Sequence, residues 1–170
     1  MPLKNPKELP KIPKTRKKKA QAALEAIPEK KDDKLEYNCS SFFYFDETTN
    51  SQKFIFRIET IAEFTSFAYE VAIDQIIEGR EFYFVLMGLK ARPNMVPKVQ
   101  PAITDLPFDG LVGEYTIHIV KQDGAINSAT YKINLFTKQI EILEEFQPKK
   151  KNNRMFCSFS VDEELFSFSK

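Results

Sequence analysis

Hydrophobic and polar residues alternate with a period of two along residues 113–136. The apolar positions on either side of a central turn are Tyr115, Ile117 and Ile119, and Tyr131, Ile133 and Leu135. Side chains of a strand point alternately to its two faces, so each half gathers its apolar residues on one face. Between the halves, Asp123-Gly124 supplies a glycine that adopts the positive φ of a tight turn. The stretch predicts an antiparallel hairpin with one apolar face.

Several further stretches have the composition of strands and are separated by short turns. They are residues 35–46, 53–60, 81–89, 137–143, 156–161 and 165–169. In the first, Phe42 and Tyr44 lie opposite Phe43 and Phe45, so both faces of that strand are aromatic. Such a strand is buried on both faces or uses one face to contact a partner, and core packing is the favoured interpretation.

Two segments are harder to interpret. Residues 61–77 fit a strand, with Phe67, Tyr69, Val71 and Ile73 on one face, better than they fit the stripe of a helix. Residues 92–112 contain four prolines. Because proline donates no hydrogen bond to a sheet, this segment is expected to be an edge crossing or a long irregular loop.

Seven or eight short strands with frequent turns predict an all-β fold, an antiparallel β-sandwich. The run Gly-Glu-Tyr-Thr-Ile from Gly113, the Asp123-Gly124 turn and the returning strand resemble the final hairpin of immunoglobulin-like domains. This resemblance covers the hairpin and implies an immunoglobulin-like fold. It implies no activity.

Charge is distributed unevenly. The net charge of the chain is +1, but residues 1–34 hold eleven Lys/Arg and five Asp/Glu, so this part is +6 and the rest is −5. Prolines in residues 1–19 favour an extended backbone, and the alanine-rich residues 15–27 favour a short helix that forms on a partner. We therefore predict a basic N-terminal arm, 1–34, and a sandwich domain, 35–170.

Candidate catalytic chemistry is sparse. His118 is the single histidine, and its alternation predicts a solvent-facing or edge position. Cys39 and Cys157 form no paired-Cys motif and are expected to be small, free core side chains. The acidic groups near residues 141–145 and 162–164 lack the spacing of a calcium loop, and no glycine-rich phosphate loop occurs. No catalytic residue, metal or cofactor is predicted.

The basic arm is the main functional signal, although it also fits a solubilising tail. The predicted partner-binding residues are Lys4, Lys7, Lys11, Lys14, Arg16, Lys17, Lys18, Lys19, Lys149, Lys150, Lys151 and Arg154. We expect a non-catalytic accessory subunit that docks on an acidic protein surface of a larger complex.

The alternative function is a nucleic-acid-associated protein whose arm contacts phosphates. An anionic membrane surface is a less favoured partner. The least favoured hypothesis is an enzyme or small-ligand binder that uses the 92–112 segment. The N-terminus lacks the apolar core of a secretory signal, so a cytoplasmic location, or one peripheral to a membrane-bound or ribonucleoprotein complex, is expected.

Overall fold

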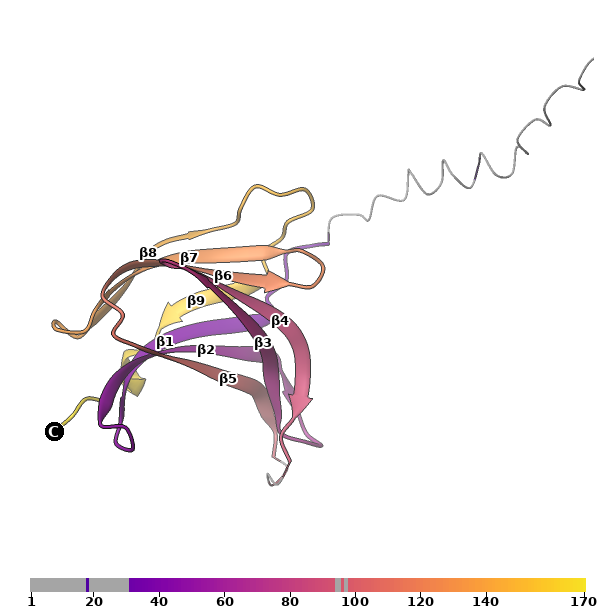
Figure 1. Cartoon of the computed structure of the whole chain (residues 1–170). Coiled ribbons are helices and arrows are strands. Elements are labelled where there is room, and N and C mark those ends of the chain that lie inside the picture. Colours follow the sequence, from indigo (N-terminus) through magenta and orange to yellow (C-terminus); the bar gives the residue numbers. More distant parts are fainter. Residues whose placement is uncertain (1–17, 19–30, 94–95, 97) are drawn as a thin grey trace, which may run out of the picture. The chain divides into compact units, whose positions relative to one another are not determined.

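A computed structural model describes residues 18, 31–93, 96 and 98–170 (Figure 1). The strands are β1 (Tyr37–Asp46), β2 (Ser51–Phe64), β3 (Tyr69–Glu78), β4 (Glu81–Ala91), β5 (Gln100–Asp109), β6 (Gly113–Lys121), β7 (Ile126–Asn134), β8 (Gln139–Phe146) and β9 (Cys157–Val161). A 3₁₀ turn, Glu163–Leu165, follows β9. The predicted helix in residues 15–27 lies outside the described residues except for Lys18.

The strands form two sheets that pack together, with strand orders β5-β2-β1-β9 and β3-β4-β6-β7-β8. This arrangement confirms an all-β, sandwich-like fold. Both sheets are mixed, because β1 pairs with β9 and β4 pairs with β6 in parallel, whereas the other neighbours are antiparallel. The wholly antiparallel pairing expected from the sequence is therefore wrong at these two pairs.

The hairpin of residues 113–136 is confirmed as β6 and β7. Tyr115 lies opposite Tyr131 in the register, and Ile117 lies opposite Ala129. At the turn, Gly124 has a φ of +89°, and the Asp123 carboxylate accepts a hydrogen bond of 3.0 Å from the N–H of Ala125. The apolar face predicted for the hairpin lies in the core between the sheets.

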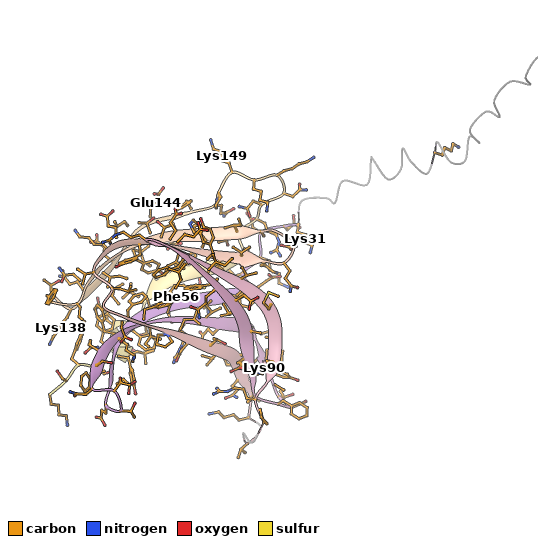
Figure 2. The ribbon with its side chains drawn as sticks, viewed as in Figure 1. Lys31, Phe56, Lys90, Lys138, Glu144 and Lys149 are labelled. Atoms are coloured by element: carbon orange, nitrogen blue, oxygen red, sulfur yellow. The ribbon has the colours of Figure 1, made fainter. Side chains whose placement is uncertain are left out.

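Aromatic side chains fill the space between the two sheets. The ring of Phe56 on β2 lies 5.4 Å from the ring of Phe84 on β4 and 6.1 Å from that of Tyr131 on β7. All three side chains are fully buried, and Phe56 lies between the sheets in Figure 2. A second group joins the sheets where the ring of Phe82 stacks on that of Phe108 at 5.0 Å. The aromatic enrichment of the sequence therefore serves the core.

Residues 61–77 and the described residues of 92–112 are both mainly extended. Residues 61–77 are strand rather than helix, as favoured, with a bend at residues 65–67 between β2 and β3. The irregular-loop reading of residues 92–112 is wrong for residues 100–109, which form β5 and pair with β2. Pro101 and Pro107 are tolerated because β5 is an edge strand of its sheet.

The C-terminal residues add to the edge of the first sheet. Residues 165–169, predicted as an edge strand, begin in the 3₁₀ turn and carry no assigned strand. The N–H of Ser167 nevertheless donates a hydrogen bond of 2.9 Å to the carbonyl of Phe43. The rings of Phe166 and Phe168 lie 5.3 and 5.8 Å from the ring of Phe43, so this segment covers one side of the core.

Replacing Phe56 with alanine tests the aromatic core. We expect Phe56→Ala to lower the free energy of unfolding by about 3–5 kcal/mol, because it leaves a cavity between two sheets whose strands cannot collapse into it. Urea unfolding followed by circular dichroism measures the change. Phe136→Ala is the matched control, since the Phe136 side chain is 85% exposed, and it should change the free energy by less than about 0.5 kcal/mol. Equal effects of the two substitutions would contradict this account.

Candidate partner-binding surface

The predicted cations of the arm lie mostly outside the described residues. Lys18 is described and exposed. The others, Lys4, Lys7, Lys11, Lys14, Arg16, Lys17 and Lys19, are not among the described residues. They remain predictions from the sequence.

The remaining predicted cations lie in the loop of residues 147–156, which connects β8 to β9 and which we call the basic loop. Lys149, Lys150 and Lys151 are exposed there. The ammonium group of Lys150 donates a hydrogen bond of 2.8 Å to the carbonyl of Gly124, so the loop leans on the β6–β7 turn. Lys149 and Lys151 have no ion pair with a described residue. These three lysines form one cationic group at the end of the hairpin.

The first described residues of the sandwich unit reach the same turn. Lys31 lies 3.7 Å from the Asp123 carboxylate, and its side chain stays 71% exposed. The N–H of Lys34 donates a hydrogen bond of 3.1 Å to the carbonyl of Met155. The N–H of Met155 in turn donates to the Asp33 carboxylate at 2.8 Å. Residues 31–34 are therefore attached beside the basic loop rather than far from it.

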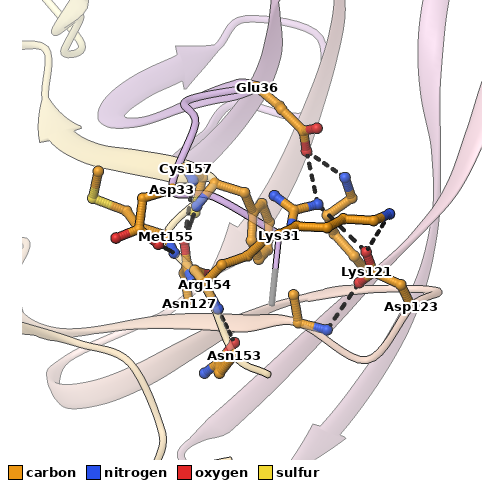
Figure 3. A network of polar contacts seen from close by, with 12 residues as sticks. Lys31, Asp33, Glu36, Lys121, Asp123, Asn127, Asn153, Arg154, Met155 and Cys157 are labelled. Atoms are coloured by element: carbon orange, nitrogen blue, oxygen red, sulfur yellow. Dashed lines mark hydrogen bonds and ion pairs between the residues drawn. The ribbon is translucent and has the colours of Figure 1, made fainter. Parts of the chain in front are cut away.

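Arg154 has a different position from the other predicted partner-binding residues. Its side chain is 5% exposed, and its guanidinium lies 3.5 Å from the carboxylate of Glu36 and 3.4 Å from that of Asp123 (Figure 3). Lys121 also pairs with Glu36. Arg154 therefore joins the segment before β1 to the β6–β7 hairpin, and we exclude it from the candidate surface.

The charges of this network alter the acidity of both carboxyl groups. Burial alone would raise the pKa of Glu36, but Lys121 and Arg154 together hold it below its ordinary value. The N–H of Ala125, and after it the charge of Arg154, hold the pKa of Asp123 below its ordinary value. Both groups are therefore more stable as carboxylates in the folded chain than in the unfolded chain.

Two buried asparagines, Asn127 and Asn153, complete the network. The amide of Asn127 donates to the carbonyl of Arg154 at 2.7 Å, and its oxygen accepts the N–H groups of Phe156 and Cys157 at 2.7 and 3.0 Å. Asn153 both donates to and accepts from the backbone of Ile126, at 2.9 Å each. Neither residue is predicted from the sequence, because a lone asparagine gives no sign of which backbone groups it will satisfy.

His118 does not have the solvent-facing position expected of it. It lies on central strand β6 and is 8% exposed, with the Tyr83 ring stacked on it at 4.5 Å. Its Nδ1 lies 2.7 Å from the Ser128 hydroxyl, and its Nε2 lies 3.9 Å from the Glu81 carboxylate without a hydrogen bond. Burial lowers the pKa of His118, although Glu81 opposes this shift. Ser128 is fully buried, so the group of Glu81, His118 and Ser128 presents no serine nucleophile to solvent.

The two cysteines are free and neighbour each other on β1 and β9. Cys39 and Cys157 are 0% and 3% exposed, which agrees with the expected core positions. Burial, and after it the neighbouring Cys157, raises the pKa of Cys39 well above its ordinary value. The thiolate of Cys39, which is the reactive form, is therefore suppressed in the folded chain.

The described residues contain neither a candidate metal-binding cluster nor a helix suited to span a membrane. Among the described residues, no group of three or more His, Cys, Asp or Glu side chains is placed to hold a metal ion. In the same part of the chain, no helix combines the length and the apolar character needed to cross a bilayer.

Comparison of the chain with models of protein families, with curated proteins and with solved structures gave no significant match.

Replacing Arg154 with methionine tests the network that joins the hairpin to residues 31–36. Complete burial of an ion pair makes loss of one partner cost about 3–5 kcal/mol. Glu36 and Asp123 are about one-third exposed and keep Lys121 and Lys31. We therefore expect Arg154→Met to cost about 2 kcal/mol in urea unfolding. Lys151→Met, at an exposed position of the same loop, is the control and should be nearly neutral.

The same variant has a defined pH dependence. Because the folded pKa values of Glu36 and Asp123 are lowered, their stabilisation is fully present above the unfolded values near 4 and is lost as pH falls through the lower folded values. Urea unfolding between about pH 6 and pH 2 should therefore show a shallower loss of stability for Arg154→Met than for the natural chain. Parallel curves for the two proteins would show that Arg154 does not set these pKa values.

Thiol labelling tests the positions of Cys39 and Cys157. In native buffer, neither thiol should react with a disulfide reagent at the rate of a free thiol, because both are buried. In urea, both thiols should react. Fast labelling of the native chain, with unchanged circular dichroism, would contradict this placement.

Proposed function

We propose that this protein is a non-catalytic accessory subunit that docks on an acidic protein surface of a larger assembly. Docking uses the basic residues 1–34 together with the exposed lysines of the 147–156 loop. An excess charge of +6 in the first 34 residues attracts an anionic surface and increases the rate of encounter. The sandwich then supplies a rigid body that fixes where the arm begins.

A single observation carries the proposal. Lys31, at the beginning of the described sandwich unit, and Lys150, in the basic loop, both contact the β6–β7 turn, at Asp123 and Gly124. Two cationic segments separated by more than a hundred residues of sequence thus meet at one end of one hairpin. A partner that binds the arm next to Lys31 meets Lys149 and Lys151 there as well.

The composition of the basic loop gives a reason to prefer a protein partner over a nucleic acid. Residues 147–155 contain no aromatic side chain, and single-stranded nucleic acids are commonly bound by stacking their bases on aromatic rings. The nucleic-acid alternative keeps one supporting observation, the exposed group of Lys149, Lys150 and Lys151. It predicts an association that nuclease removes and that weakens steeply with salt.

Two finer features belong to this proposal. The body has the immunoglobulin-like character that its last hairpin resembles. The alanine-rich residues 15–27 form a short helix on the partner, since a helix of this length is marginal by itself. The proposed location is cytoplasmic or peripheral to a larger complex.

Removal of residues 1–30 tests the proposal without disturbing the body. The truncation keeps residues 31–34, because Asp33 and Lys34 bond to the backbone of Met155. The tagged full chain and the truncated chain are used to capture partners from the native source, before and after nuclease treatment. We expect capture of a protein complex that survives nuclease and falls about tenfold or more on truncation. Unchanged capture by the truncated chain would refute the role of the arm.

Neutralising the basic loop tests its share of the surface. The triple variant Lys149→Ser, Lys150→Ser and Lys151→Ser should weaken capture and flatten its salt dependence, because it removes three exposed charges from the docking end. The matched control replaces three exposed lysines elsewhere with serine, at Lys98, Lys132 and Lys170. Equal losses in the two triple variants would indicate that net charge, rather than this surface, governs docking.

A further inference from the structure

An apolar hollow lies where β1 begins and where β2, β4 and β6 end. It has a volume of about 430 Å³, and its apolar lining comes from Leu35, Tyr37, Ile61, Phe64 and Leu89, residues that we call the apolar mouth. Clefts of this size commonly accept small molecules or single side chains of a partner. The hollow lies outside the basic loop, and its lining includes Glu36 and Lys121 of the Arg154 network.

The mouth exposes large apolar side chains at the ends of strands that are otherwise well buried. Leu35, Ile61 and Leu89 are 40%, 45% and 44% exposed. Three residues before Ile61, Ile58 on the same strand is fully buried. The pairing of β2 with β5 shifts register between Glu59 and Glu63, so β2 leaves the regular ladder at the mouth.

The exposed apolar surface continues past the lining of the hollow. The ring of Phe64 lies 5.0 Å from that of Tyr69, which lies 6.3 Å from the ring of Phe67. Phe67 is 58% exposed, and Met87, two residues before Leu89, is 44% exposed. Contiguous apolar surface of this kind on a folded chain commonly marks a place where another molecule binds.

The position of the mouth along the chain points to the nature of that molecule. Leu35 follows the last residue of the basic arm directly, and Lys34 also lines the hollow. Lys121 also lines the hollow, and Lys31 and Lys150 contact the turn that follows Lys121. An acidic surface drawn to the arm is therefore brought to the mouth, where apolar groups of the partner can cover the exposed apolar side chains.

From this placement we infer that the apolar mouth receives one or two large apolar side chains from an acidic segment of the docking partner. This inference rests on the proposed function, since the arm and basic loop select the acidic segment. The mouth adds an anchor that salt does not screen. A second copy of this chain fits less well, because each copy would bring its own +6 arm to the contact.

A free fatty acid also fits the apolar lining less well. Its carboxylate needs a cation within the hollow, and Lys121 is already paired with Glu36, which leaves the exposed Lys34 as the one lysine of the lining for that role. An acidic peptide needs no free cation inside the mouth, because Lys31 and the loop lysines lie outside it. Dodecanoate is therefore included in the test as a competing probe.

The experiment selects partners from a random dodecapeptide phage library on the immobilised full chain. We expect the selected peptides to combine Asp or Glu with Leu, Ile or Phe. The best peptide is then synthesised with a fluorophore, and its affinity is measured by anisotropy. The double variant Ile61→Ser and Leu89→Ser should lower that affinity about tenfold or more, because it removes apolar contacts at an anchor position.

The matched control replaces two exposed apolar side chains elsewhere, Val112 and Leu143, which are 40% and 43% exposed. Val112→Ser with Leu143→Ser should leave the affinity unchanged. Circular dichroism and urea unfolding verify that both double variants stay folded. Selected peptides that lack the acidic and apolar pattern, or that bind the mouth variant as well as the natural chain, would overturn the inference. Dodecanoate need not displace the peptide. If dodecanoate binds but the selection gives no peptide, the inference would also be overturned.

Failure of the inference can be told apart from failure of the proposed function. If truncation of residues 1–30 abolishes partner capture while the mouth variant captures normally, the inference fails and the proposed function stands. If the mouth variant loses the peptide while truncation leaves capture intact, the mouth is a binding site and the proposed function fails. Loss of capture in both variants, with retention in the Val112 and Leu143 control, supports both.

Discussion

A buried polar connection between the two sheets is the constraint on which the arrangement of this molecule depends. The amide of Asn127, on β7 of one sheet, satisfies backbone groups of Arg154, Phe156 and Cys157, which lead into β9 of the other sheet. If these buried backbone groups had no hydrogen-bond partner, the folded state would be destabilised, and aromatic packing would not compensate for the loss. These hydrogen bonds therefore fix the start of β9 relative to β7 of the other sheet.

Arg154 extends this connection to the beginning of the sandwich. Its guanidinium lies between the carboxylates of Glu36 and Asp123, so residues before β1 and the tip of the β6–β7 hairpin have one shared cation. The same tip receives Lys31 and Lys150. The buried charge thus positions the exposed ones, and the geometry of the candidate surface follows from the core rather than from the surface residues alone.

Local pattern was sufficient to predict the parts of the fold that local pattern determines. Alternation identified the β6–β7 hairpin and its turn at Gly124, because the two strands and their connection are adjacent in sequence. The composition of residues 53–60 and 81–89 predicted two strands, which are found within β2 and β4, where Phe56 and Phe84 are buried in the core. Alternation also favoured strand over helix for residues 61–77, where tertiary packing agrees with the local preference.

Other features depend on contacts between distant residues, which a single sequence does not display. The parallel pairs β1–β9 and β4–β6 are set by which edges remain open after the hairpins form. Prolines left two alternatives for residues 92–112, an edge crossing or an irregular loop, and the pairing of β5 with β2 at the edge of the sheet decides between them. Arg154 resembles its lysine neighbours in sequence, but the carboxylates of Glu36 and Asp123 bury it. The apolar mouth was equally hidden, because its residues come from three separate strands or their ends.

The pairing of β1 with β9 has a consequence for how the chain acquires its structure during synthesis. The first strand of the sandwich to leave the ribosome finds its parallel neighbour only after residues 157–161 have been translated. Until then one edge of β1 has unpaired backbone groups beside exposed phenylalanines, a state that invites aggregation. Because the contact between β1 and β9 spans most of the sandwich sequence, we expect folding to be slow and the edge of β1 to stay open until β9 has been translated.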